Sequence, residues 1–88
     1  MVVFITGASA GFGRAIAKRF AQEGHRIIAL ARRKERLESL QKEIKECFII
    51  PCDICNREGL EYHLSSLPKD YQNIDILVNN AGLALGLE

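Results

Sequence analysis

The residues best suited to chemistry form a glycine-rich run near the start of the chain. The run is Thr6-Gly7-Ala8-Ser9-Ala10-Gly11-Phe12-Gly13, with its glycines spaced G-x-x-x-G-x-G. We expect Gly7 to make a tight turn, Gly11 to let the backbone approach a pyrophosphate, and Gly13 to allow close packing of a helix on a strand. The first N–H groups of that helix would face an anion, with the helix dipole behind them. The run therefore predicts a dinucleotide-binding loop, and a P-loop is excluded because no Gly-Lys-Ser/Thr follows.

A basic segment follows about 20 residues beyond the glycine run, where an NAD site usually carries Asp or Glu. Here the position is Ala31, followed by Arg32 and Arg33. An acidic side chain would repel a 2′-phosphate, whereas a guanidinium can bind it with two charge-assisted hydrogen bonds. The alternative is a solvated charge run, but basic residues in the first turn of a helix oppose its dipole. We therefore expect NADP rather than NAD, with Arg32 and Arg33 on the 2′-phosphate.

The role of Ser9 stays open at this point. Its short hydroxyl side chain can donate to a phosphate or can simply stabilise the loop through local hydrogen bonds. The two histidines, His25 and His63, are expected on the surface, and neither is a catalytic candidate.

The apolar pattern predicts strands and helices in strict alternation, which would position these residues. Strands are predicted at Val2–Thr6, Arg26–Ala31, residues 48–50 and residues 74–78. The first helix is expected to start at Phe12, to bury Phe12, Ala15, Ile16 and Phe20, and to end at Gly24. The second would bury Leu37, Leu40 and Ile44, and the third would run from an N-cap at Asn56 to Pro68. Strands separated by helices of this length imply right-handed crossovers and a parallel sheet.

Composition limits the remaining possibilities. A chain of 88 residues, 48% hydrophobic and 26% charged, fits one small globular domain. The net charge of +1 provides no field that would attract nucleic acid or an anionic membrane. No apolar stretch approaches the roughly 18 residues of a membrane span, and no basic leader precedes Val2. We expect a cytoplasmic protein.

The three cysteines are Cys47, Cys52 and Cys55, and the last two form a C-x-x-C. An odd number of cysteines without an export signal favours reduced thiols. A structural zinc site would need two further ligands beyond this pair, with only Cys47 and the two histidines to supply them. We expect small thiols and no metal site.

Two motifs together resemble the short-chain dehydrogenase/reductase family: the G-x-x-x-G-x-G run preceded by Thr6, and Asn79-Asn80-Ala81-Gly82 after the fourth strand. The resemblance implies a Rossmann-type α/β fold with strand order 3-2-1-4. It also implies that the Asn-Asn-Ala-Gly segment steadies the central sheet, with Asn80, Ala81 and Gly82 beside the cofactor. Asp53, followed by Ile54, would approach the adenine ring.

The segment from Ser66 to Gly86, together with Gly11-Phe12-Gly13, is similar to the NADP-dependent serine/3-hydroxy acid dehydrogenases. That resemblance implies a small hydroxy acid such as serine as substrate and a homotetrameric parent protein. The family's proton-transfer groups are a Ser and a Tyr-x-x-x-Lys pair that lie downstream of the Asn-Asn-Ala-Gly segment. Here Tyr62 is followed four residues later by Ser66, and Tyr71 by Asp75, so no catalytic residue is assigned.

We therefore interpret residues 1–88 as the N-terminal NADP-binding part of a single Rossmann domain that stops before the catalytic segment, and we expect it to be inactive alone. One sheet face would be covered only by the third helix, which predicts self-association or poor solubility. Two alternatives share the glycine loop. A non-catalytic NADP-sensing module fits every motif, whereas a methyltransferase that uses S-adenosylmethionine would want an acid where Ala31 stands.

Overall fold

The computed structural model describes residues 1–9 and 11–80, so Ala10, Ala81 and Gly82 lie outside the described residues. The elements are, in order, β1 (Val2–Thr6), α1 (Gly11–Gln22), β2 (Arg26–Ala31), α2 (Lys34–Glu43), β3 (Cys47–Pro51), α3 (Arg57–Ser65), the 3₁₀ turn η1 (Lys69–Tyr71) and β4 (Ile76–Asn79). No helix within the described ranges has the length and apolar character that a membrane span requires.

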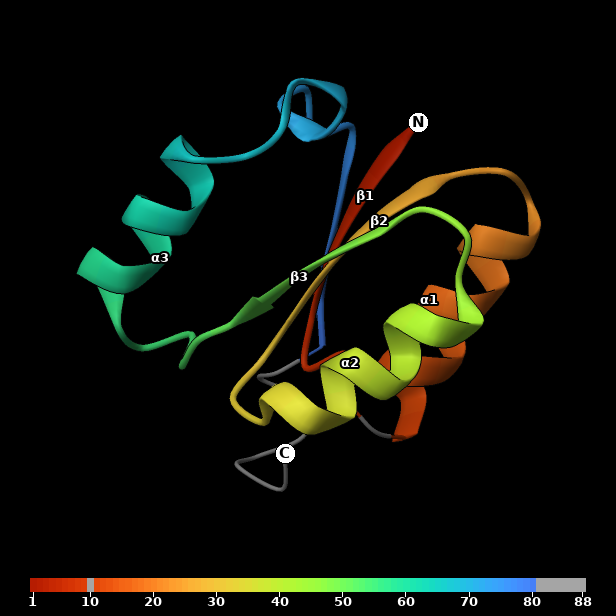
Figure 1. Cartoon of the computed structure of the whole chain (residues 1–88), viewed down its shortest axis with the longest axis horizontal. Helices are drawn as coiled ribbons and strands as arrows, with labels where there is room; N and C mark the ends of the chain where they lie inside the picture. The colour runs from red at the N-terminus through yellow and green to blue at the C-terminus, as the bar shows by residue number, and fades with distance from the viewer. Residues whose placement is uncertain (10, 81–88) are drawn as a thin grey trace.

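The four strands form one parallel sheet in the order β3-β2-β1-β4, as Figure 1 shows. β1 lies between its two partners: Val3 is level with Ile27 of β2 and with Ile76 of β4. All five residues of β1 are buried, as expected for a continuous apolar strand in the middle of such a sheet. The predicted Rossmann-type order 3-2-1-4 is therefore confirmed.

The helices form two layers, with α1 and α2 on one face of the sheet and α3 on the other (Figure 1). The side chains of β1 alternate between these layers because successive residues of a strand point to opposite faces. Val3 and Ile5 pack in the cluster that contains Leu37 and Leu40 of α2. Val2, Phe4 and others pack on the opposite side, where α3 contributes two leucines that are only partly buried. Figure 1 shows α3 standing away from the sheet.

Two of the four residues expected on the buried face of the first helix lie outside the core. Phe12 is 82% exposed and Ala15 is also exposed, whereas the buried residues of α1 are Gly13 and Ala17. Ile16 and Phe20 flank this line and are partly buried. The helix contacts the sheet through its two smallest inward-facing residues, because α1 approaches the strands too closely near its start for a large side chain.

Two strand boundaries differ from the sequence-based expectation. β3 includes Pro51, which an edge strand tolerates because its outer side needs no ladder hydrogen bond. β4 begins at Ile76 rather than at residue 74. The carboxylate of Asp75 accepts a hydrogen bond of 2.8 Å from the backbone N–H of Val2, and the Asp75 N–H donates to the Val2 carbonyl at 2.9 Å. The side chain thus takes the place of a ladder partner just before the strand.

The local chemistry of two helix ends is as predicted, but α3 ends at Ser65, before the predicted Pro68. The side chain of Asn56 accepts a hydrogen bond from the Gly59 N–H at 3.1 Å and caps α3 as predicted. After α1, Gly24 has φ +91°, and the His25 N–H donates to the Phe20 carbonyl at 3.2 Å, which closes the helix with a Schellman-type pattern.

Candidate cofactor-binding site

The loop between β1 and α1 has a backbone that needs glycine at two positions. Gly7 has φ +64° and Gly11 has φ +57°, both in the left-handed region that side chains disfavour. A Cβ added at Gly11 would meet nothing within 4 Å, so space is open in front of the helix at that point. The first turn of α1 carries no acidic side chain. Its free N–H groups and helix dipole therefore favour an anion there.

Gly13 permits the close approach of α1 to the end of β1. A Cβ built at this position would clash with the Gly7 carbonyl oxygen and would lie 2.7 Å from the Gly7 carbonyl carbon. It would also lie 2.8 Å from Nδ2 of Asn80. Any side chain at position 13 would force the loop, the helix and the end of β4 apart.

A hydrogen-bond network centred on Thr6 joins the glycine loop to the end of β4. The Thr6 hydroxyl accepts from the Asn80 N–H at 3.0 Å and donates to the side-chain oxygen of Asn79 at 3.2 Å. Nδ2 of Asn80 donates to the Gly7 carbonyl at 3.1 Å. Asn80 is buried, so these bonds are made largely out of contact with water. Thr6 opens the glycine-rich run of the sequence, but no separate role was predicted for it. Its place directly before Gly7, at the end of a strand, was the available signal.

Ser9 has an unusual environment. Its residue is only 4% exposed, and its hydroxyl oxygen has no hydrogen-bond partner among the residues that the structure describes. The neighbouring Ala8 N–H donates to the Leu30 carbonyl at 3.1 Å, which ties the loop to the end of β2. A buried hydroxyl without a partner costs about 1–3 kcal/mol. The loop keeps this donor beside the N-terminus of α1, where a bound anion would satisfy it.

Two guanidinium groups lie at the end of β2. Ala31 is fully buried, whereas Arg32 and Arg33 are exposed. Arg33 is the N-cap residue of α2, with extended backbone angles, and its side chain makes no capping hydrogen bond. Because Leu30 is bonded to the glycine loop, the arginines and the N-terminus of α1 belong to the same edge of the sheet.

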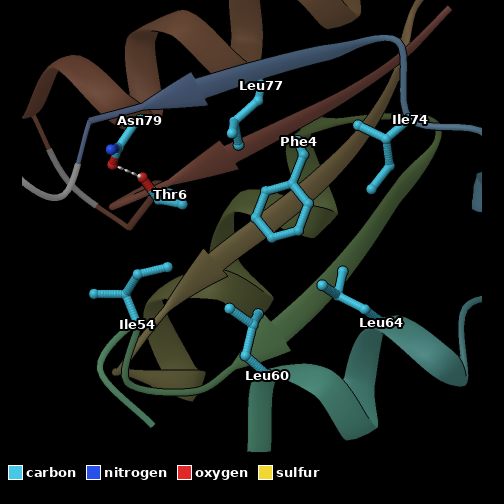
Figure 2. A pocket seen from close by; sticks show the side chains of 8 residues that line it. All are labelled: Phe4, Thr6, Ile54, Leu60, Leu64, Ile74, Leu77 and Asn79. Atoms are coloured by element: carbon cyan, nitrogen blue, oxygen red, sulfur yellow. Dashed lines mark hydrogen bonds between the residues drawn. The ribbon is translucent and has the colours of Figure 1, made fainter. Parts of the chain in front are cut away.

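Asp53 and Ile54 follow β3 at that edge. The Cys52 N–H donates to the Ala31 carbonyl at 2.9 Å and holds this turn beside the end of β2. One carboxylate oxygen of Asp53 accepts from the Cys55 N–H at 2.9 Å, so Asp53 also stabilises its own turn. Ile54 is 37% exposed and points into a hollow that Thr6 and Asn79 also line, as Figure 2 shows.

Comparisons with known proteins assign the chain to a family and to a known fold. The family model described as short chain dehydrogenase matches residues 1–87. The chain belongs to the short-chain dehydrogenase family. The NADP-dependent 3-hydroxy acid dehydrogenase YdfG of Escherichia coli K12 is 54% identical over 89 residues, covering all of this chain and 36% of that protein. A probable NADP-dependent dehydrogenase of Dichelobacter nodosus is 53% identical over 98% of this chain and 82% of its own length.

Solved structures of short-chain dehydrogenases share the fold. The crystal structure of serine dehydrogenase from Escherichia coli has a TM-score of 0.84 and 49% identity, covering 88% of this chain and 36% of that one. A closed form of serine dehydrogenase complexed with NADP⁺ has the same TM-score and identity, covering 88% of this chain and 32% of that one. The chain thus spans about a third of the length of the first curated relatives that it matches.

As in other parallel α/β sheets, the strands of this short-chain dehydrogenase chain end at one edge, next to the switch point between β1 and β4. The described residues predicted as cofactor contacts all lie at or beside that edge: Gly7, Ala8, Ser9, Gly11, Phe12, Gly13, Arg32, Arg33, Asp53, Ile54 and Asn80. Three predicted contacts (Ala10, Ala81 and Gly82) lie outside the described residues.

Two described side chains of this short-chain dehydrogenase chain, Tyr71 and Cys47, have pKa values raised further from neutral pH. Burial raises the pKa of the Tyr71 phenol, which is the wrong direction for a general base. Burial also raises the pKa of the Cys47 thiol to about 11. Within residues 1–9 and 11–80, no three His, Cys, Asp or Glu side chains gather in a way that could hold a metal ion.

Proposed function

We propose that this chain is the NADP-binding part of an NADP-dependent oxidoreductase of the short-chain dehydrogenase type. The observation that carries the proposal is the buried, unpartnered hydroxyl of Ser9 beside the N-terminus of α1. A desolvated donor next to exposed helix N–H groups is suited to a phosphate oxygen of the cofactor. Gly7, Ala8, Gly11 and Gly13 would supply the backbone that lets the pyrophosphate approach.

The preference for NADP rests on Arg32 and Arg33. The buried Ala31 offers no carboxylate to the ribose hydroxyls of NAD, and the two guanidinium groups follow at once. A planar guanidinium can bind the 2′-phosphate with paired hydrogen bonds, which a point charge such as Lys34 cannot match. The relatives from E. coli and D. nodosus are named as NADP-dependent, which supports the same assignment.

Other residues would fit around the rest of the cofactor. Asp53 and Ile54 would border the adenine ring, and the exposed ring of Phe12, which the core does not use, would cover part of the dinucleotide. Asn80 would border the cofactor: one N–H of its Nδ2 donates to the Gly7 carbonyl and holds the loop in shape, and the second N–H is left to donate elsewhere. Ala10, Ala81 and Gly82 are retained as contacts on the family resemblance.

When bound, NADP(H) supplies or accepts the hydride, and the protein positions it. We propose a small 3-hydroxy acid, such as serine, as the substrate class of the full-length protein. The support is the activity for which relatives are named, among them the serine 3-dehydrogenase of Agrobacterium fabrum at 51% identity. Because no catalytic residue is assigned within residues 1–88, we expect these residues alone to be inactive. We also propose that the full-length protein is a homotetramer, and sedimentation of that protein would test its oligomeric state. We further propose that it is cytoplasmic.

The decisive assay uses these 88 residues joined to the remaining C-terminal part of the E. coli 3-hydroxy acid dehydrogenase. We expect the fused protein to reduce NADP⁺ with L-serine or another 3-hydroxy acid, and to prefer NADP⁺ over NAD⁺ by roughly tenfold or more in kcat/KM. NADPH absorbance reports the rate, and the 88-residue chain is the control. Binding of NADP⁺ without turnover in the fused protein would favour an NADP-sensing module, and an NAD⁺ preference would contradict the cofactor assignment.

A further inference from the structure

The turn between β3 and α3 carries a cysteine on each side of the two residues that we place near the adenine ring. Cys52 follows β3 directly, and Cys55 stands directly before Asn56, the N-cap of α3. Asp53 and Ile54 lie between the two cysteines. Both cysteines are free thiols. The cofactor assignment uses the two residues inside this C-x-x-C and gives the sulfur atoms no part.

Hydrogen bonds tie both cysteines to Asp53. The Cys52 thiol donates to the Asp53 backbone carbonyl at 3.3 Å, and the Asn56 N–H donates to the same oxygen at 2.9 Å. The Cys55 N–H donates to a carboxylate oxygen of Asp53 at 2.9 Å. The sulfur of Cys52 and the peptide that links Cys55 to Asn56 therefore meet at one carbonyl oxygen. The fold thus brings the backbone of the second cysteine toward the sulfur of the first, which a disulfide between them requires.

The thiols differ in their access to solvent. Cys52 is 8% exposed and packs in the apolar cluster that contains Leu30 and Ile50. Cys55 is exposed on the surface of the turn. A small oxidant therefore reaches Cys55 first, and Cys52 is the neighbouring thiol that can react with the oxidised sulfur. The third thiol, Cys47, is buried in the cluster on the opposite face of the sheet, away from this pair.

We propose that Cys55 is an oxidation site that forms a reversible disulfide with Cys52. The bond displaces the turn that carries Asp53 and Ile54, and the displaced turn binds the adenine end of the cofactor less tightly. The effect on binding rests on the proposed function, whereas the disulfide and the displacement of the turn do not.

The turn moves because the disulfide is incompatible with its present hydrogen bonds and packing. Oxidation removes the proton that the Cys52 thiol donates to the Asp53 carbonyl. It also draws a buried sulfur and an exposed one together, so the two residues between them must move. The Cys52 N–H is bonded to the Ala31 carbonyl at 2.9 Å, so this movement takes place beside the end of β2, at the proposed cofactor edge.

Hydrogen peroxide is the oxidant that we assign to this reaction. The Cys55 thiolate attacks one peroxide oxygen, the O–O bond breaks, and a sulfenic acid and hydroxide form. The Cys52 sulfur then attacks the Cys55 sulfur, the S–S bond forms, the S–O bond breaks, and the hydroxyl leaves as water with a thiol proton. The two sulfurs are oxidised and the peroxide is reduced to water. A small thiol reverses the bond by exchange and itself becomes a disulfide.

The test compares the 88-residue chain after hydrogen peroxide with the same chain reduced by dithiothreitol. We expect the treated chain to stay monomeric and to lose about 2 Da, while its free thiols fall from three to one. Amide NMR shifts should centre on Asp53 and Ile54. The Kd for NADP⁺ should rise by roughly fivefold or more and return to its first value after reduction.

Two cysteine variants provide the controls. Cys55→Ser should keep its NADP⁺ affinity after peroxide, because the disulfide cannot form and an exposed position tolerates the change. Cys47→Ala is the matched control, and it should respond to peroxide as the wild type does, because Cys47 lies on the other face of the sheet.

Several results would overturn the proposal. These are a disulfide between two chains, an intramolecular disulfide that leaves the amides of Asp53 and Ile54 unshifted, and an unchanged Kd in a treated chain that binds NADP⁺ when reduced. An equal response of Cys55→Ser and the wild type would overturn it as well. If the reduced chain does not bind NADP⁺, the proposed function is contradicted instead, and the mass and amide shifts alone decide on the disulfide.

Discussion

Nδ2 of Asn80 donates a hydrogen bond of 3.1 Å to the backbone carbonyl of Gly7, a residue 73 positions earlier in the chain. The same amide nitrogen lies 2.8 Å from the place where a side chain at Gly13 would begin. The loop after β1, the start of α1 and the end of β4 are therefore fitted to one another around three residues. These contacts hold together the edge of the sheet that we propose for the cofactor.

The close fit at Gly13 predicts a large loss of stability on Gly13→Ala. The new Cβ would clash with the Gly7 carbonyl and crowd Asn80, so the loop and helix must move, at a cost of about 3 kcal/mol. Gly24→Ala is the control, because its Cβ would meet nothing and only the positive φ is unfavourable, at about 1–2 kcal/mol. Urea unfolding followed by circular dichroism measures both. An equal loss for the two variants would contradict the packing described here.

The sequence predicted those features that depend on local chemistry. The continuous apolar run of β1, the glycine spacing after it and the Asn56 cap all follow from residue type and position. The buried face of α1 did not follow, because the contact of Gly13 with Gly7 orients the helix and places Phe12 outside. The start of β4 did not follow either, since it depends on a hydrogen bond between Asp75 and Val2, which are distant in sequence.

The candidate site also has some features that the sequence predicted and others that depend on contacts between distant residues. The glycine spacing predicted the loop of Gly7 and Gly11, and the family resemblance implied that Asn80 lies beside it, at the edge where the parallel strands end. The sequence left the role of Ser9 open between phosphate binding and loop stabilisation. The structure bears on these two roles because the buried Ser9 hydroxyl makes no hydrogen bond within the described residues. The contribution of Thr6 was missed because it depends on the Asn80 N–H, which only the folded sheet brings within 3.0 Å.

Ser9→Ala should weaken cofactor binding without lowering the stability of the cofactor-free protein. If the hydroxyl serves the cofactor, its removal should weaken NADP⁺ binding by roughly tenfold or more, the worth of a hydrogen bond to a charged group. Stability without cofactor should stay the same or rise, because the variant removes a buried polar atom that lacks a partner. Calorimetric titration and thermal unfolding give the two values. Unchanged affinity together with lower stability would mean that Ser9 only supports the loop.

Arg32→Asp combined with Arg33→Ala should reverse the cofactor preference of the fused protein. We expect KM for NADPH to rise by at least roughly tenfold, because the 2′-phosphate loses its guanidinium partners and meets a carboxylate. KM for NADH should change much less. Arg36→Ala is the control, since this exposed arginine on α2 lies beyond the pair. An unchanged ratio of the two KM values in the double variant would remove the arginines from the site.

The buried thiol of Cys47 predicts a loss of stability at alkaline pH. Its pKa is raised to about 11 in the folded protein, against an ordinary value of 9.0. The unfolded chain therefore releases this proton at a lower pH than the folded protein does. The contribution of the protonated thiol to the free energy of unfolding is complete below pH 9 and is lost as pH rises toward 11. The loss amounts to about 2 kcal/mol. Urea unfolding between pH 8 and 11 should show a shallower decline in Cys47→Ala than in the wild type, and parallel curves would contradict the assignment.

The most direct test of the central claim is a binding measurement on the 88-residue chain with two parts of the cofactor, adenosine 2′,5′-bisphosphate and 5′-AMP. Both probes reach only groups at the edge where β1, β2 and β3 end, so the test does not need a catalytic segment. We predict that the bisphosphate binds at least roughly tenfold more tightly, with amide NMR shifts centred on Ser9, Arg32 and Arg33. Equal affinities, or shifts that leave these three residues unchanged, would contradict an NADP site at this edge.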